Sequence, residues 1–280
     1  WTAGTKIPPP GGSQYEVFFA PHEVNFISHV RGINMQIRVT VPPEDDIELR
    51  RVRISNVSNE IRRLALTSYG EVVLTEMDND RRHPAFNKMV VESEFHNNLN
   101  ALIFHRRPRA AGETPNYLLH GLIGPAGELV RVKYESDRSR FLGRGRTPRE
   151  PLALDPNGPG LTGKTGYVLD PVFALRYEID LVPHSSIEVT FITTASDSRQ
   201  KAINLARDYQ DWSRIDRAFE QARYAAEIEM RRMDIDAGKM EQYQKLLSML
   251  FYPQLSLRAH PEVLAANRRG QPALWAYAIS

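Results

Sequence analysis

Short apolar runs occupy the chain from about Tyr15 to Ala195. They are rich in Val, Ile, Phe, Tyr and Thr, and residues that favour turns separate them, which is typical of β-strands. In residues 34–41 and 186–194, apolar side chains alternate with polar ones, as expected for strands with one buried face. The pattern predicts at least nine strands, at residues 34–41, 48–57, 63–74, 89–94, 100–105, 117–123, 128–134, 173–181 and 186–194.

The number of predicted strands limits the fold. Nine or more strands are too many for a small barrel, and two stacked antiparallel sheets bury their apolar faces most economically. The sequence therefore predicts a mainly β chain, with a large two-sheet antiparallel β-sandwich over residues 1–196.

The apolar period changes to that of an α-helix after Ala195. Three amphipathic helices are predicted, at residues 198–211 with an N-cap at Ser196 or Asp197, at about 213–233, and at 236–251 before Pro253. Their apolar faces are expected to cover a sheet or to lead into a further domain. We therefore predict a C-terminal helical linker over residues 197–280.

Composition limits the classes of function. The chain has 280 residues, of which 41% are hydrophobic, and its 36 basic and 34 acidic residues leave a net charge of +2, which does not favour nucleic acid or an anionic membrane. The absence of cysteine excludes disulfides, thiolate catalysis and zinc sites with cysteine ligands. Apolar runs stay well short of the roughly 20 residues that a membrane-spanning helix needs, so no membrane span is predicted in this segment.

Searches for catalytic motifs find no P-loop, no GxGxxG after a strand, no HExxH and no GxSxG. Apart from His22 and His29, the histidines are scattered without the spacing of metal ligands. The carboxylate pairs, such as Asp45 with Asp46, lie in segments typical of turns. The sequence therefore predicts no catalytic residue and no metal site.

One segment, residues 136–151 (SDRSRFLGRGRTPREP), carries a concentration of hydrogen-bond donors. We call it the arginine loop. Guanidinium groups and exposed backbone amides suit sugar hydroxyls, carboxylates or phosphate, although a solvated basic loop has the same composition. Its five arginines are Arg138, Arg140, Arg144, Arg146 and Arg149, and they surround Phe141, Gly143 and Gly145.

Several segments resemble the glycoside hydrolase family 94 sugar phosphorylases, particularly the branch found in cyclic β-1,2-glucan synthases. The resemblance is carried by VPPEDDI (41–47) followed by VRISN (52–56), HPAFNKMVVESEF (83–95), RRPR (106–109), DRSRFLGRGR (137–146), LTGKTGYVLDPVFAL (161–175), FYP (251–253) and GQPALWAYAIS (270–280). HPAFNK together with FLGRGR and the terminal LW motif is the most specific combination.

The resemblance implies an N-terminal supersandwich of the galactose-mutarotase type, joined by linker helices to an (α/α)6 barrel that supplies the catalytic Asp and the phosphate-binding groups. Because the matching segments end where that barrel would begin, we expect this chain to be part of a longer protein and inactive alone. The resemblance implies a larger membrane protein, with this part on the cytoplasmic side of the bacterial inner membrane. That protein would polymerise glucose from UDP-glucose, and its phosphorylase-like part would cleave β-1,2-glucan and so adjust chain length.

In phosphorylases of this family, a loop of the sandwich reaches over the sugar site, often that of the partner subunit in a homodimer. The arginine loop matches it by sequence order, although the Gly- and Pro-rich stretch at 151–163 departs from the family pattern. The resemblance therefore implies substrate contacts from Arg138, Arg140, Arg144 and Arg146, with Phe141 packing or stacking. The implied partners are β-1,2-glucan or a related oligosaccharide, the barrel domain and a second subunit. No cofactor is implied beyond inorganic phosphate as the co-substrate of the longer protein.

Three functions from different classes stay open at this point. The first is a noncatalytic sandwich domain of a glucan-processing phosphorylase. The second is a free-standing carbohydrate-binding or interaction module, for which an aromatic platform is expected, whereas Trp1, Trp212 and Trp275 lie near the ends or in the linker. The third is a mutarotase-like enzyme, which needs a histidine and a carboxylate together in the sandwich cleft.

Overall fold

The computed structural model describes residues 14–108, 112–126, 128, 130–251 and 265–266. The expectations for Arg109, Pro253 and the terminal motif at 270–280 lie outside these described residues. The chain divides into two compact units, Trp1–Glu227 and Ile228–Ser280. The second unit contains helix α6 (Ala237–Phe251), on which Tyr243, Leu246 and Leu247 are exposed.

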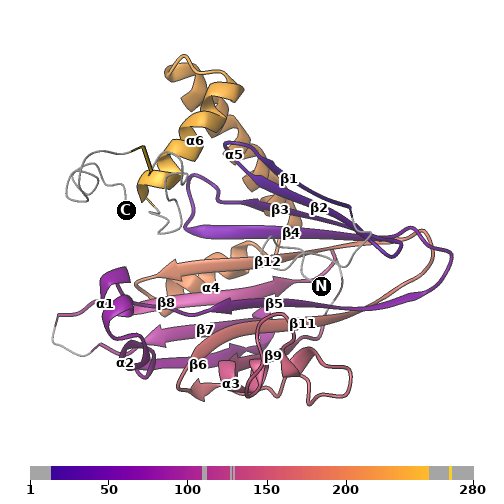
Figure 1. Ribbon diagram of the computed structural model, residues 1–280, viewed down its shortest axis with the longest axis vertical. Helices are drawn as coiled ribbons and strands as arrows, with labels where there is room; N and C mark the ends of the chain where they lie inside the picture. The colour runs from indigo at the N-terminus through magenta and orange to yellow at the C-terminus, as the bar shows by residue number, and fades with distance from the viewer. Residues whose placement is uncertain (1–13, 109–111, 127, 129, 252–264, 267–280) are drawn as a thin grey trace. The chain divides into compact units, whose positions relative to one another are not determined.

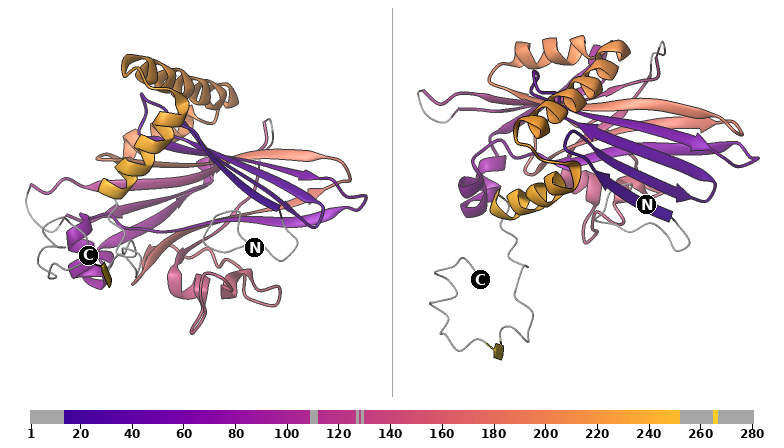
Figure 2. Two further views of the ribbon diagram at one scale, coloured as in Figure 1. Left: turned by 45° about the horizontal axis from the view of Figure 1, so that its top comes forward. Right: turned by 90° about the horizontal axis from the view of Figure 1, so that it is seen from above.

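The first unit is built on two antiparallel sheets (Figures 1 and 2). The larger sheet has nine strands in the spatial order β1 (Gln14–Phe19), β2 (Val24–Val30), β3 (Ile33–Thr40), β4 (Ile47–Asn56), β12 (Ser186–Ser196), β8 (Asn116–Ile123), β7 (Ala101–Arg106), β6 (Val91–His96) and β10 (Gly166–Tyr167). The smaller sheet has the order β5 (Arg62–Glu71), β11 (Pro171–Leu181) and β9 (Lys133–Asp137). The predicted mainly β, two-sheet antiparallel sandwich followed by helices is therefore confirmed.

Helices and short turns complete the described structure. The short elements are α1 (Met77–Arg82), α2 (Pro84–Lys88), η1 (Asn97–Leu99), α3 (Arg138–Leu142) and η2 (Leu152–Leu154), and the longer helices are α4 (Arg199–Asp208) and α5 (Trp212–Arg232). The three predicted C-terminal helices are confirmed, but α4 begins after Ser198 rather than after Ser196 or Asp197. The carboxylate of Asp211 accepts hydrogen bonds from the backbone N–H and the hydroxyl of Ser213, so α5 begins slightly before the predicted position.

One strand prediction is wrong in its bounds. Residues 128–134 were expected to form a strand, but the ladder with β11 begins only at Lys133 and runs to Asp137. Val130, Val132 and Tyr134 nevertheless pack against the core between the sheets. Their alternation therefore reports which side chains are buried rather than which backbone groups pair with a neighbouring strand.

Apolar side chains fill the space between the two sheets. Phe104 on β7, Leu122 on β8 and Leu175 on β11 are almost completely buried in this inner core. Each side chain of this size stabilises the fold by about 1.5–3 kcal/mol when it leaves water. The inner core therefore holds the small sheet against the middle of the large one.

The opposite face of the large sheet carries a second apolar layer, which the helices cover. Alternate residues of its strands, such as Leu49, Ile103 and Ile192, pack with Ala202 of α4 and Ile215 of α5. Because both faces of the central strands are buried, β8 shows five consecutive buried residues instead of an alternation. The helices and the sheet therefore share one core.

A polar contact fixes the position of α4 and α5 on the sheet. Tyr209 is 1% exposed, and its hydroxyl donates a hydrogen bond of 2.7 Å to Asp45, which also accepts one of 3.1 Å from Arg214. Burial, followed by the neighbouring Asp45 carboxylate, raises the pKa of Tyr209 to about 12. The Asp45–Asp46 pair, expected in a turn, thus contributes one carboxylate that anchors the helices.

A histidine lies in the inner core and connects the sheets. His120 of β8 is 3% exposed, and its ring nitrogens lie 2.9 Å from the hydroxyls of Thr193 on β12 and Ser68 on β5. Its ring stacks on Phe173 at a centroid distance of 3.9 Å. Burial, with a smaller effect of the positive charge of Arg50, lowers the pKa of His120 to about 3.

We expect this histidine to make the fold sensitive to mild acid. The unfolded chain takes up a proton near pH 6.5 that native His120 does not accept, so stability is lost as the pH falls below 6.5. The free energy of unfolding should drop by roughly 1.5 kcal/mol between pH 6.5 and 5, measured by urea denaturation. His120→Phe should remove this slope, whereas the exposed control His184→Asn should keep it, and an unchanged slope in His120→Phe would contradict the assignment.

The contact between Tyr209 and Asp45 gives a second expectation. Tyr209→Phe removes one hydrogen bond to a carboxylate and should lower the free energy of unfolding by about 1.5–3 kcal/mol. Tyr224→Phe on the exposed part of α5 is the matched control and should change it by less than about 0.5 kcal/mol. If urea denaturation showed the same loss of unfolding free energy in both variants, the buried hydrogen bond would stabilise the fold no more than an exposed hydroxyl does.

Candidate functional site

The arginine loop packs on the outer face of the small sheet, away from the large one (Figure 2). Phe141, Leu142 and Leu161 form a small core there with Val172 and Ala174 of β11. Phe141 is 2% exposed, and its ring stacks on Tyr69 at a centroid distance of 4.7 Å. Of the two roles expected for Phe141, the structure places it in packing, where it anchors the loop.

Local interactions explain the path of the loop. The Asp137 carboxylate caps α3 by accepting hydrogen bonds from the backbone N–H of Ser139 at 2.9 Å and from its hydroxyl at 2.6 Å. Gly143 ends the helix at φ 82°, and a Cβ there would lie 2.7 Å from Cβ of Leu152. Position 143 therefore requires glycine both for its backbone angle and for its close packing.

A buried carboxylate lies beneath the loop. Glu135 is 0% exposed, and one of its oxygens accepts hydrogen bonds from the backbone N–H groups of Ser136 and Asp137, each at 3.0 Å. Its other oxygen accepts from the backbone N–H and the hydroxyl of Thr162, at 3.2 and 2.5 Å. Four hydrogen bonds offset the cost of burying this carboxylate, and they join the start of the loop to Thr162, which follows the end of the loop in the sequence.

Arg138 is held by acidic side chains from two other segments. Its Nε lies 3.0 Å from Glu71 on β5, and its Nη1 lies 3.6 Å from Asp170, which also pairs with Lys88 of α2 at 2.7 Å. The Tyr69 hydroxyl lies 3.3 Å from the same Glu71 oxygen. Burial and then the Glu71 charge raise the pKa of Tyr69 to about 12, so its hydroxyl keeps its proton and donates to Glu71.

The remaining arginines differ in how many of their hydrogen-bond donors are already bound within the chain. Arg146 pairs with Asp155 at 3.1 Å, and Arg140 makes only long contacts, at 3.8 Å with Asp137 and 3.4 Å with the Thr162 hydroxyl. The Asn157 backbone N–H, followed by Arg146, lowers the pKa of the Asp155 carboxyl. The side chain of Arg144 is exposed and makes no hydrogen bond or ion pair within the part of the chain that the structure describes. Arg140 and Arg144 therefore keep most of their donors available to a ligand.

The partners of Arg138 were not predicted from the sequence. Lys88 and Asp170 lie in the segments HPAFNKMVVESEF and LTGKTGYVLDPVFAL, which carry the family resemblance, but no role was assigned to them. They are 82 positions apart in the sequence and meet because Lys88 ends α2 and Asp170 immediately precedes β11. The gathering of family segments around Arg138 is the signal that could have pointed to this cluster.

The buried histidine does not form the pair that a mutarotase-like mechanism needs. The hydrogen-bond partners of His120 are the hydroxyls of Ser68 and Thr193, and the charged neighbour that shifts its pKa is Arg50 rather than a carboxylate. Within the described ranges, no group of three or more His, Asp or Glu side chains is arranged to hold a metal ion. The described helices also include none that is long and apolar enough to cross a membrane.

Comparisons with known proteins agree with the resemblance seen in the sequence. The cyclic beta-(1,2)-glucan synthase NdvB of Rhizobium meliloti (strain 1021) is 30% identical over 280 residues, which is 100% of this chain and 10% of that protein. The chain thus spans about a tenth of the length of the curated relative it matches.

Two solved structures are similar to part of this chain. A bacterial glucoamylase complexed with acarbose matches with a TM-score of 0.46 and 13% identity, over 76% of this chain and 28% of that chain. The polysaccharide lyase BACCELL_00875 matches with a TM-score of 0.38 and 12% identity, over 64% of this chain and 23% of that chain.

The family assignment rests on the match of this chain to one domain family. The family described as glycosyl hydrolase 94, supersandwich domain, matches residues 1–212, which include both sheets, the arginine loop and α4. The match covers most of the chain and agrees with the two-sheet fold described above. The chain therefore belongs to the supersandwich domain family of glycosyl hydrolase 94.

Proposed function

We propose that this chain is the noncatalytic supersandwich part of a protein of the cyclic β-1,2-glucan synthase type. It supports a phosphorylase-like domain that cleaves β-1,2-glucan with inorganic phosphate and so controls chain length. The observation that carries the proposal is the 30% identity to the glucan synthase NdvB over all 280 residues, together with the family match over residues 1–212. In this proposal the chain works on the cytoplasmic side of the bacterial inner membrane.

The arginine loop supplies the proposed contact with the glucan. Arg138 and Arg146 are engaged in ion pairs and hold the loop in shape, and Phe141 anchors it. Arg140 and Arg144 then present guanidinium donors to sugar hydroxyls at the edge of the catalytic domain or of a partner subunit. A loop fixed by Glu135 and its four hydrogen bonds loses little further freedom on binding, which favours affinity.

The two free arginines give a direct test. In the full-length protein, Arg144→Ala and Arg140→Ala should each weaken binding of linear β-1,2-glucan roughly tenfold, because each removes a charged hydrogen-bond donor. Isothermal titration calorimetry measures the change, and thermal unfolding should stay near that of the parent. Arg63→Ala, at an exposed arginine of β5, is the control that should bind normally. Normal binding by both loop variants would reject the proposed contact.

The division of labour between the domains gives another test. The 280-residue chain should release no sugar phosphate from β-1,2-glucan and inorganic phosphate, because in this proposal the catalytic Asp and the phosphate-binding groups belong to the barrel domain. A protein extended through the following domain should release it, measured by coupled detection of the sugar phosphate. Phosphorolysis by the 280-residue chain alone would overturn the noncatalytic assignment.

A further inference from the structure

The outer face of the large sheet changes from apolar to polar along its strands. On β4, Ile47 and Leu49 pack under the helices, and the next residues on the same face are Arg51, Arg53 and Ser55. On β3, the residues that share this face with Arg53 and Arg51 are Gln36 and Arg38, as their pairing positions show. The helices cover the apolar part of the face and reach the first polar residues, where Asp216 of α5 pairs with Arg51 at 2.6 Å and the Phe219 ring lies 4.6 Å from the Arg38 guanidinium. The polar part continues from there across β1–β4.

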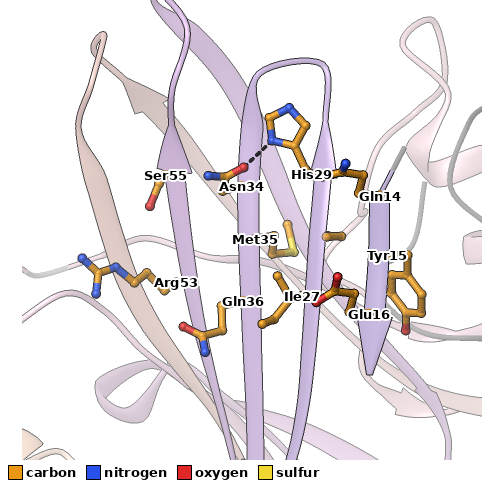
Figure 3. Close-up of a pocket in the computed structure, with 11 residues that line it drawn as sticks. Gln14, Tyr15, Glu16, Ile27, His29, Asn34, Met35, Gln36, Arg53 and Ser55 are labelled. Carbon is orange, nitrogen blue, oxygen red and sulfur yellow. Dashed lines mark hydrogen bonds between the residues drawn. The ribbon is translucent and has the colours of Figure 1, made fainter. Parts of the chain in front are cut away.

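This polar part is hollowed into a groove. Its first section has a volume of about 590 Å³ and includes Gln14, Glu16, Ile27, Asn34 and Gln36 (Figure 3). Its second section, of about 400 Å³, includes Asn25, Arg38, Arg51 and Glu188, and Gln36 and Arg53 line both sections. Each section lies within the range of known ligand sites, roughly 300–1,000 Å³.

The groove is long enough for more than one sugar ring. Its lining residues come from five neighbouring strands, in the order β1, β2, β3, β4 and β12. With a spacing of about 4.8 Å between strands, it extends over roughly 19 Å. A linear ligand can therefore lie across the strands.

The charges of the groove cancel. Three glutamates and three arginines line its two sections, namely Glu16, Glu23, Glu188, Arg38, Arg51 and Arg53. Arg38 pairs with Glu23 at 2.6 Å, and Glu188 lies 2.8 Å from Arg51 and 3.8 Å from Arg53. With no net charge on its lining, the groove does not favour an anionic ligand such as a phosphate or a sulfated chain.

Amide side chains supply the remaining polar groups. Gln36 donates one hydrogen bond of 3.2 Å to Asn25, and Asn34 pairs with His29. A carboxamide offers two N–H donors and two acceptor positions, so these bonds leave most of the hydrogen-bonding capacity of the amides unused within the described structure. Neighbouring donors and acceptors of this kind suit the adjacent hydroxyl groups of a sugar.

Apolar surface is also available beside the amides. Ile27 lies among the lining residues, and Phe18 is 54% exposed on the same face, opposite Asn25 in the β1–β2 ladder. An aromatic ring and an aliphatic side chain next to amides form the combination on which the CH face of a pyranose packs.

We propose that this groove binds a neutral linear oligosaccharide. Gln36, Asn25 and Asn34 hydrogen-bond its hydroxyls, while Phe18 and Ile27 pack against its rings. The groove lies on the outer face of the large sheet, whereas the arginine loop lies on the outer face of the small one. The proposal therefore does not depend on the role of the loop.

Titration of the whole 280-residue chain with linear β-1,2-glucan, linear maltooligosaccharides and heparin tests the groove. We expect a neutral oligosaccharide to bind and heparin not to bind. Gln36→Ala and Asn25→Ala should each weaken this binding roughly three- to tenfold, which corresponds to the loss of one or two hydrogen bonds. Phe18→Ala should weaken it by a similar factor through the lost ring contact.

Two controls separate the groove from other sites. Asn204→Ala removes an exposed amide of α4 outside the groove and should leave binding unchanged, and Arg63→Ala at an exposed arginine of β5 should do the same. Binding that is lost in Arg144→Ala but kept in the groove variants would place the sugar on the loop and overturn the proposal. Binding of heparin alone, or of no sugar, would also overturn it.

Discussion

The large sheet must be covered on both faces over its central strands, and the rest of the structure follows from this constraint. β7, β8 and β12 carry apolar side chains on both sides, so neither face can be left in water without losing several kcal/mol. The small sheet covers one face, and α4 with the first part of α5 covers the other. Of the helices expected as a linker, α4 and the first part of α5 therefore contribute to the same core as the sandwich.

The small sheet in turn carries the arginine loop, because its outer face is apolar only in a limited area around Val172 and Ala174. Phe141 and Leu142 cover that area, and the buried Glu135 hydrogen-bonds both to the start of the loop and to Thr162 beyond its end. The arginines are therefore presented by a supported segment rather than by a solvated basic loop. The arginines also differ in their ion pairs, since Arg138 pairs with Glu71 while the Arg144 side chain makes no hydrogen bond or ion pair with the described residues.

The sequence predicts correctly those features that are determined within a single segment of the chain. The strands near residues 34–41 and 186–194 and the three helices are correct because alternation and helical period are local consequences of burial. The strand at residues 128–134 is misplaced because side chains can alternate in burial without backbone pairing. No local pattern specifies which distant segments become neighbours in the fold. The ion pairs of Asp170 with Lys88 and Arg138 depend on such neighbours, and so does the groove across five strands.

The two proposed sugar contacts differ in a way that follows from their charges. In the groove, every arginine has a glutamate partner, so the attraction to a ligand comes from hydrogen bonds and ring contacts, which salt affects little. In the loop, Arg144 carries an exposed charge with no ion pair in the described structure, and Arg140 has only a long one of 3.8 Å to Asp137, so salt weakens their attraction to a bound sugar more. An oligosaccharide that reaches both sites binds more tightly overall, because binding at the first site raises its effective concentration at the second. Two moderate contacts on separate faces can therefore retain a long oligosaccharide while each one still releases it quickly.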